Sequence, residues 1–169
     1  MNTKQKSILV ISSMLICCAI VFAFSLIKFF VKDSLETKVT GDNWGLFDLD
    51  SARFRIPFEK NSLIVHFSTT CSSCQTEANK LASNNAQLRR QHTKVYFVSE
   101  ESIAAIQQFQ RELQLEDSTV ISFLKSNDSI FEIFGTAYVP QMFLYSNKKF
   151  IKQFKGETKV EAIIQHLPK

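Results

Sequence analysis

Strand-like and helix-like segments alternate along residues 53–167, and this alternation limits the possible folds more than any other feature of the chain. Short apolar runs that suit strands are separated by segments with apolar residues at helical spacing. The expected strands cover 53–58, 63–67, 94–98, 118–121, 142–145 and 150–154, and the expected helices cover 72–90, 103–113, 129–134 and 160–167. Parallel strand pairs come first in this order, and an antiparallel hairpin comes last. The pattern predicts an α/β fold, with a central mixed sheet and helices on both faces.

A stretch without charged residues, from Ile8 to Ile27, precedes this domain. As a helix it would be about 30 Å long, which matches the hydrocarbon core of a bilayer. Lysines flank it on both sides, and a short basic tail before a first apolar segment usually stays in the cytoplasm. We therefore expect a single-pass protein of the cell membrane whose domain faces the periplasm or the cell exterior. Its expected parts are a cytoplasmic tail over 1–7, a signal-anchor helix over 8–30, a tether over 31–50 and a globular domain over 51–169.

A cleaved signal peptide is the alternative interpretation of this segment. Ala23-Phe24-Ser25 offers small residues at the two positions that a signal peptidase reads. The apolar run exceeds the roughly 7–15 residues of a signal-peptide core, which favours an anchor. Cys17 and Cys18 lack the preceding small residue that lipid attachment would need, so we expect them to be apolar fillers of a lipid-facing helix.

The expected domain carries no net charge. Four of the twenty basic residues precede Asp33, the first acidic residue, which leaves sixteen basic residues against sixteen acidic ones. A nucleic-acid-binding domain needs a basic face that releases counterions from phosphates. The composition therefore argues against nucleic-acid binding, and we expect a monomer without a cofactor.

The two cysteines of the domain, Cys71 and Cys74, stand where an apolar strand gives way to a helix. If Thr69 or Thr70 caps this helix, Cys71 lies in its first turn, where unpaired N–H groups and the helix dipole stabilise a thiolate. Cys74 lies on the same helical face, with roughly 5–6 Å between the Cβ atoms, so a small local shift closes a disulfide. This arrangement predicts that Cys71 is a nucleophile and that Cys74 pairs with it.

Glu77 follows Cys74 on the same face of the expected helix. A carboxylate at this position could take the proton from Cys74 when that thiol resolves a mixed disulfide. The alternative is a solvated surface glutamate, because charged side chains are mostly exposed.

A zinc site is disfavoured, and we expect no metal. A zinc ion usually takes four protein ligands, whereas this chain has a single pair of cysteines and three scattered histidines, His66, His92 and His166. We expect His66 to point away from a core that Val65 and Phe67 face, and the other two histidines to lie at helix ends on the surface.

Two blocks of sequence together resemble the thioredoxin superfamily. The first is VHFSTTCSSCQTE over residues 65–77, and the second is YVPQMFL over residues 138–144. Within the superfamily, the chain is most similar to the membrane-anchored, exported thiol-disulfide oxidoreductases of the TlpA/ResA type. The resemblance covers about residues 50–167, and its most specific part is the joint occurrence of the cysteine pair, the glutamate and the Val-Pro dipeptide.

This resemblance implies a thioredoxin fold behind a single transmembrane helix, and it implies a role for each matching residue. Cys71 attacks, Cys74 resolves and Glu77 tunes the pair. Pro140 is cis and faces the cysteines, while the backbone of Val139 pairs with the substrate chain. The dithiol and the Cys71–Cys74 disulfide then alternate during the reaction.

We therefore expect an enzyme, an exported thiol-disulfide oxidoreductase that acts on protein disulfides and is recycled by an upstream redox partner. Reduction of apocytochrome, in cytochrome c biogenesis, or of other exported disulfides is common in this family. Thr70 and Ser73 replace a Trp and a Pro that family members often carry, which affects the redox poise. The same replacements keep open a second interpretation, a non-catalytic interaction module with a structural Cys71–Cys74 disulfide. A thiol peroxidase is disfavoured, because Ser68 stands where that activity needs a threonine.

Overall fold

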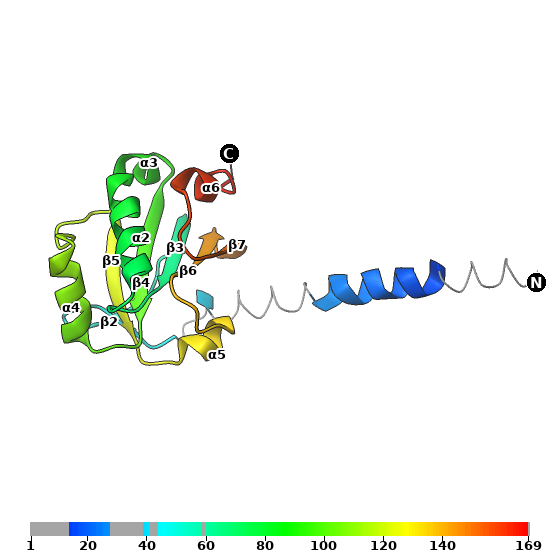
Figure 1. Ribbon diagram of the computed structural model, residues 1–169, viewed down its shortest axis with the longest axis horizontal. Coiled ribbons are helices and arrows are strands. Elements are labelled where there is room, and N and C mark those ends of the chain that lie inside the picture. The colour runs from blue at the N-terminus through cyan, green and yellow to red at the C-terminus, as the bar shows by residue number, and fades with distance from the viewer. Residues whose placement is uncertain (1–13, 28–38, 41–43, 59, 169) are drawn as a thin grey trace, which may run out of the picture. The chain divides into compact units, whose positions relative to one another are not determined.

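The computed structural model describes residues 14–27, 39–40, 44–58 and 60–168. The chain divides into two units, Met1–Leu35 and Glu36–Lys169, and in the first of them residues 14–27 form a helix (Figure 1). Among the described residues, no helix combines the length and the hydropathy that a bilayer crossing requires. The predicted tail over 1–7, the remainder of the predicted anchor over 8–13 and 28–30, and residues 31–38 and 41–43 of the predicted tether lie outside the described residues.

The second unit is built on a seven-stranded sheet with the strand order β2-β1-β5-β4-β3-β6-β7 (Figure 1). Strands β3, β4 and β5 are parallel, and all other neighbours are antiparallel. The predicted mixed sheet, with parallel strands ahead of a closing hairpin, is confirmed, and the pair β1–β2 precedes it. The strands are β1 Leu46–Phe47, β2 Arg53–Phe54, β3 Asn61–His66, β4 Thr93–Ser99, β5 Ile121–Ser126, β6 Gln141–Ser146 and β7 Lys149–Lys155.

Helices lie on both faces of this sheet, as predicted. One hydrophobic cluster joins the sheet to buried residues of α2, α3, α4 and α6, so these four helices cover one face. Helix α5 lies on the other face, where the Phe134 ring stacks on Phe143 of β6 with 3.9 Å between the ring centroids. The helices are α2 Ser72–Ser83, α3 Asn85–Arg90, α4 Ile103–Glu112, α5 Ile130–Phe134 and α6 Val160–Ile164.

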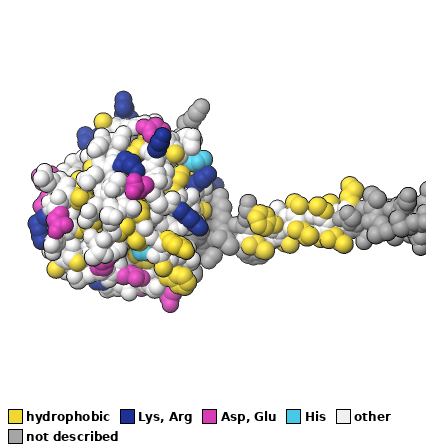
Figure 2. Space-filling view, viewed as in Figure 1, with side chains coloured by type: hydrophobic (Ala, Val, Ile, Leu, Met, Phe, Trp, Pro, Cys, Tyr) yellow, Lys and Arg dark blue, Asp and Glu magenta, His cyan; other side chains and the backbone are white. Residues whose placement is uncertain are grey.

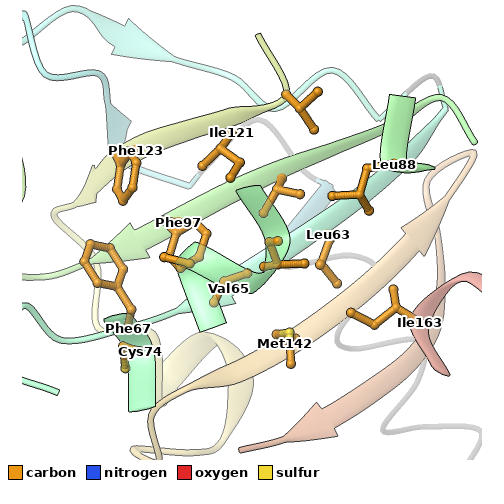
Figure 3. Packing of buried hydrophobic residues seen from close by; sticks show 14 of the residues in the cluster. Leu63, Val65, Phe67, Cys74, Leu88, Phe97, Ile121, Phe123, Met142 and Ile163 are labelled. Atoms are coloured by element: carbon orange, nitrogen blue, oxygen red, sulfur yellow. The ribbon is translucent and has the colours of Figure 1, made fainter. Parts of the chain in front are cut away.

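A group of phenylalanine rings packs around Phe67 in the core, and Figure 3 shows three of them, Phe67, Phe97 and Phe123. The Phe67 ring contacts Phe97, Phe109 and Phe123, with centroid distances of 5.5, 4.9 and 5.9 Å. Most of these contacts are tilted or edge-to-face, the arrangements that aromatic quadrupoles favour. Because Phe67 directly follows β3, this packing holds the end of the strand from which the cysteine loop leaves.

The last part of the predicted tether, residues 44–50, takes part in the folded unit. Leu46 and Phe47 form β1 between β2 and β5. The buried Trp44 donates a hydrogen bond of 2.9 Å from its indole nitrogen to Ser126 Oγ, and its ring meets Phe134 edge-on. The composition of this segment does not reveal the contacts of Trp44 and β1 with β5, because β5 lies about eighty positions further along the chain.

Several predicted boundaries differ from the structure. Of the expected strand over 53–58 only Arg53–Phe54 is a strand, and the expected helix over 160–167 ends at Ile164. The expected helix over 72–90 is two helices, α2 and α3, because Asn84 leaves helical geometry and donates its side-chain amide to the Lys80 carbonyl at 2.8 Å. The expected strand over 118–121 begins only at Ile121. Ser118 instead forms a turn, in which its hydroxyl accepts a 3.0 Å hydrogen bond from the Ile121 N–H.

Candidate active site

Cys71 is itself the N-cap of α2, which corrects the expectation that Thr69 or Thr70 caps the helix. Its backbone is extended, with φ −89° and ψ 111°, and its sulfur accepts a hydrogen bond of 3.2 Å from the Cys74 N–H. An N-cap side chain normally uses an oxygen for this purpose. Here the sulfur accepts from one N–H at the N-terminus of the helix, so a thiolate at Cys71 is stabilised by this donor and by the helix dipole.

Cys71 and Cys74 are joined by a disulfide, with 5.2 Å between their Cα atoms. The two residues differ in exposure: Cys74 is 0% exposed and belongs to the hydrophobic core, whereas Cys71 is half-buried. Of the two sulfurs, only that of Cys71 can therefore react with another molecule. The predicted assignment of Cys71 as the attacking sulfur fits this asymmetry.

Glu101 holds the loop between β3 and Cys71. Its carboxylate accepts hydrogen bonds from the Thr69 N–H at 3.1 Å and from the Thr69 hydroxyl. Burial raises the pKa of Glu101, but hydrogen bonds from Thr69 and Ser68 outweigh it, so that the pKa lies below its usual value. A negative charge is thus fixed at Thr69, in the loop that leads to Cys71. The sequence contained no local signal for this role, because Glu101 follows β4 rather than the cysteine motif.

Glu77 is 0% exposed, so the structure excludes the solvated surface glutamate. Its Oε2 accepts hydrogen bonds from Lys80 Nζ at 3.1 Å and from the Thr158 N–H at 3.0 Å. Its Oε1 is buried without a hydrogen-bond partner. Glu77 follows Cys74 by one turn of α2, and the two side chains are equally buried.

The Val139–Pro140 peptide bond is cis, as the resemblance implies. The following residue, Gln141, pairs with His66 at the end of β3, which places the proline beside the start of the cysteine loop. The Pro140 carbonyl accepts a 2.9 Å hydrogen bond from the Gly156 N–H. Val139 and Cys71 both pack against the core cluster. The pairing of Gln141 with His66 brings the Val-Pro dipeptide to the end of β3 from which the cysteine loop leaves.

His66 points to the face opposite Val65 and Phe67, as predicted, but it is not a solvated side chain. Burial lowers the pKa of His66, and Glu100 together with a hydrogen bond to the Tyr138 backbone opposes this shift only in part. His92 is exposed and His166 is half-buried. Within the described part of the chain, no group of three or more His, Cys, Asp or Glu residues is placed to hold a metal ion.

Solved structures with a similar fold include three bacterial proteins. The chain is 15% identical to Mycobacterium tuberculosis DsbF, with a TM-score of 0.61, over 77% of this chain and 94% of that one. It is 14% identical to a secreted M. tuberculosis disulfide oxidoreductase homologous to E. coli DsbE, with a TM-score of 0.58, over 76% and 95% of the two chains. It is 16% identical to the exposed lipoprotein thioredoxin Etrx1 of Streptococcus pneumoniae, with a TM-score of 0.56, over 71% and 93%.

The sequence matches no protein-family model and no curated protein. The structural similarity nevertheless identifies the fold of residues 44–168 as the thioredoxin fold. Thiol-disulfide oxidoreductases are among the proteins that share it.

Proposed function

We propose that this protein is an exported thiol-disulfide oxidoreductase that reduces disulfides of other proteins through Cys71 and Cys74. The observation that carries the proposal is the difference between the two linked sulfurs. Cys71 is half-buried at a helix N-terminus, and Cys74 is fully buried one turn below it. A permanent structural disulfide would need neither this exposure nor the cap position of Cys71.

In the proposed reaction, the Cys71 thiolate attacks one sulfur of a substrate disulfide, and the other substrate sulfur leaves as a thiolate. The Cys74 thiol then loses its proton and attacks the Cys71 sulfur of the mixed disulfide. This step forms the Cys71–Cys74 disulfide and releases the second substrate thiolate. The substrate gains two electrons. An upstream dithiol partner then supplies two electrons that reduce the Cys71–Cys74 disulfide again.

Glu77 is proposed as the group that takes the proton of Cys74, because its free Oε1 lies in the same buried region. Val139 and the cis Pro140 are proposed to bind the substrate backbone beside Cys71. Residues 8–30 are proposed to anchor the protein in the cell membrane as a signal-anchor, with the folded unit in the periplasm or outside the cell.

Trapping of partner proteins tests the proposal. In the Cys74→Ala variant no second sulfur can resolve the mixed disulfide, so Cys71 should remain joined to its substrates. Cys17 and Cys18 are exposed free cysteines and are replaced by serine in every protein used. The control carries Cys71→Ala as well. Reducible adducts that require Cys71 support the proposal, whereas equal recovery from both proteins, or no adduct at all, contradicts it.

A further inference from the structure

A pocket of about 250 Å³ lies beside the cysteine pair, at the ends of β3 and β4. One wall contains Ser68, whose carbonyl accepts a 3.2 Å hydrogen bond from the Cys71 N–H. The lining also contains Val139, the residue before the cis proline. A side chain that enters this pocket would therefore belong to a residue close to the sulfur that Cys71 attacks.

The pocket is negatively charged. Glu100 and Glu101 line it, and its lining contains neither lysine nor arginine. In the described part of the chain, no lysine or arginine forms an ion pair with either carboxylate; Lys125 bonds to the backbone carbonyl of Glu100 instead, at 3.1 Å. The remaining titratable group, His66, is held neutral at neutral pH by burial.

Two large apolar side chains at the pocket are unusually exposed: Phe131 lines it, and Tyr138 stands in the chain between two lining residues, Ala137 and Val139. Phe131 is 59% exposed and Tyr138 is 75% exposed, and besides Ile151 they are the only exposed large hydrophobic residues described in the folded unit. Figure 2 shows apolar side chains gathered over α5 with acidic side chains beside them. An apolar patch of this kind next to a reactive centre indicates contact with another molecule.

We propose that this pocket binds a lysine or arginine side chain of the partner polypeptide, close to the cysteine that Cys71 attacks. This inference rests on the proposed exchange function and names the specificity of its site. The aliphatic stem of such a side chain covers apolar surface such as Phe131, and its cation can lie on that ring or reach Glu100. A glutamate is repelled, and an uncharged side chain leaves the Glu100 charge uncompensated.

Short peptides with one cysteine, carried as a mixed disulfide with thionitrobenzoate, test the proposal on the Cys74→Ala protein in the Cys17→Ser and Cys18→Ser background. Attack by the Cys71 thiolate forms the Cys71–peptide disulfide and breaks the bond to thionitrobenzoate, which leaves with the electron pair and is measured by absorbance. Lysine, norleucine or glutamate is placed in turn at each position near the peptide cysteine. Norleucine keeps the stem of lysine without its charge.

At one position, lysine should react about three- to fivefold faster than norleucine, which is the range of an exposed ion pair, and the advantage should fall with salt. Glu100→Gln, whose amide oxygen can still accept the Ile130 N–H, should abolish the advantage. The matched control, Glu116→Gln, removes an exposed charge outside the pocket and should retain it.

Equal rates for the three peptides at every position, or an advantage that Glu100→Gln retains, would overturn the pocket assignment alone. If no peptide releases thionitrobenzoate, Cys71 is not an attacking sulfur, and both the pocket assignment and the proposed function are wrong.

Discussion

The backbone N–H of Cys74 donates a hydrogen bond to the sulfur of Cys71, with 3.2 Å between nitrogen and sulfur. Both cysteines share one helical turn, but only Cys71 receives this donor and only Cys71 reaches the surface. Negative charge is therefore more stable on Cys71 than on Cys74 in the reduced protein.

Alkylation of Cys71 should occur at lower pH than alkylation of an ordinary thiol. In the Cys74→Ala protein without Cys17 and Cys18, we expect the iodoacetamide rate to reach its half-maximum at least about one pH unit below 8.5, the usual thiol value. The backbone N–H of residue 74 is retained in this variant, so its hydrogen bond remains. The Cys71→Ala protein, in which Cys74 is buried, should react slowly at every pH. A midpoint near 8.5 for Cys71 would contradict thiolate stabilisation by the helix N-terminus.

Glu77→Gln should slow resolution of the mixed disulfide without slowing its formation. Glutamine can keep the hydrogen bond from the Thr158 N–H but cannot take a proton from Cys74. We expect a loss on the order of 10²-fold in the single-turnover rate of resolution, the lower range for a general base. Glu157→Gln is the matched control, because Glu157 also contacts Lys80, at 3.5 Å, but is largely exposed. Equal losses in both variants would assign the effect to Lys80 rather than to proton transfer.

Glu101→Gln should destabilise the protein at neutral pH and have a smaller effect in acid. The pKa of Glu101 is lower in the folded state than its ordinary value of 4.5, so its contribution to stability is present above pH 4.5 and is lost as pH falls through the folded value. We expect a loss of about 0.5–1.5 kcal/mol at pH 7, the worth of a hydrogen bond, which shrinks toward pH 3. Urea unfolding at the two pH values measures it. An equal difference at both would show that the carboxylate charge is not involved.

His66 should make the folded unit less stable in mild acid. Because burial lowers the pKa of His66 in the folded state, the unfolded chain takes up a proton near pH 6.5 that the folded protein does not. The free energy of unfolding should therefore fall as pH decreases below about 6.5, until the lower folded value is reached. His66→Gln should flatten this part of the profile, and His92→Asn, at an exposed position, should leave it. An unchanged slope in His66→Gln would contradict the buried, neutral state of this ring.

The cysteine pair shows what can be predicted from the local sequence. The change from an apolar strand to a helix at Cys71 is a matter of side-chain periodicity and of short-range hydrogen bonding, so the position of both cysteines and the order of the central elements could be predicted. The identity of the cap could not, because Thr69, Thr70 and Cys71 are all able to cap a helix. Thr69 donates two hydrogen bonds to Glu101, which follows another strand, and its hydroxyl is therefore engaged away from the helix.

The sequence by itself was sufficient to predict the mixed α/β sheet and the place of the two cysteines where a strand gives way to a helix, because both depend on residues within a few positions of one another. The balance of charge in the predicted domain follows from composition alone. The place of β1 beside β5, the burial of Glu77 against Thr158 and the pocket between Ser68 and Val139 depend on pairings across tens of residues. Such pairings depend on which side chains fill the space between packed elements, and this is settled only when the whole core has assembled.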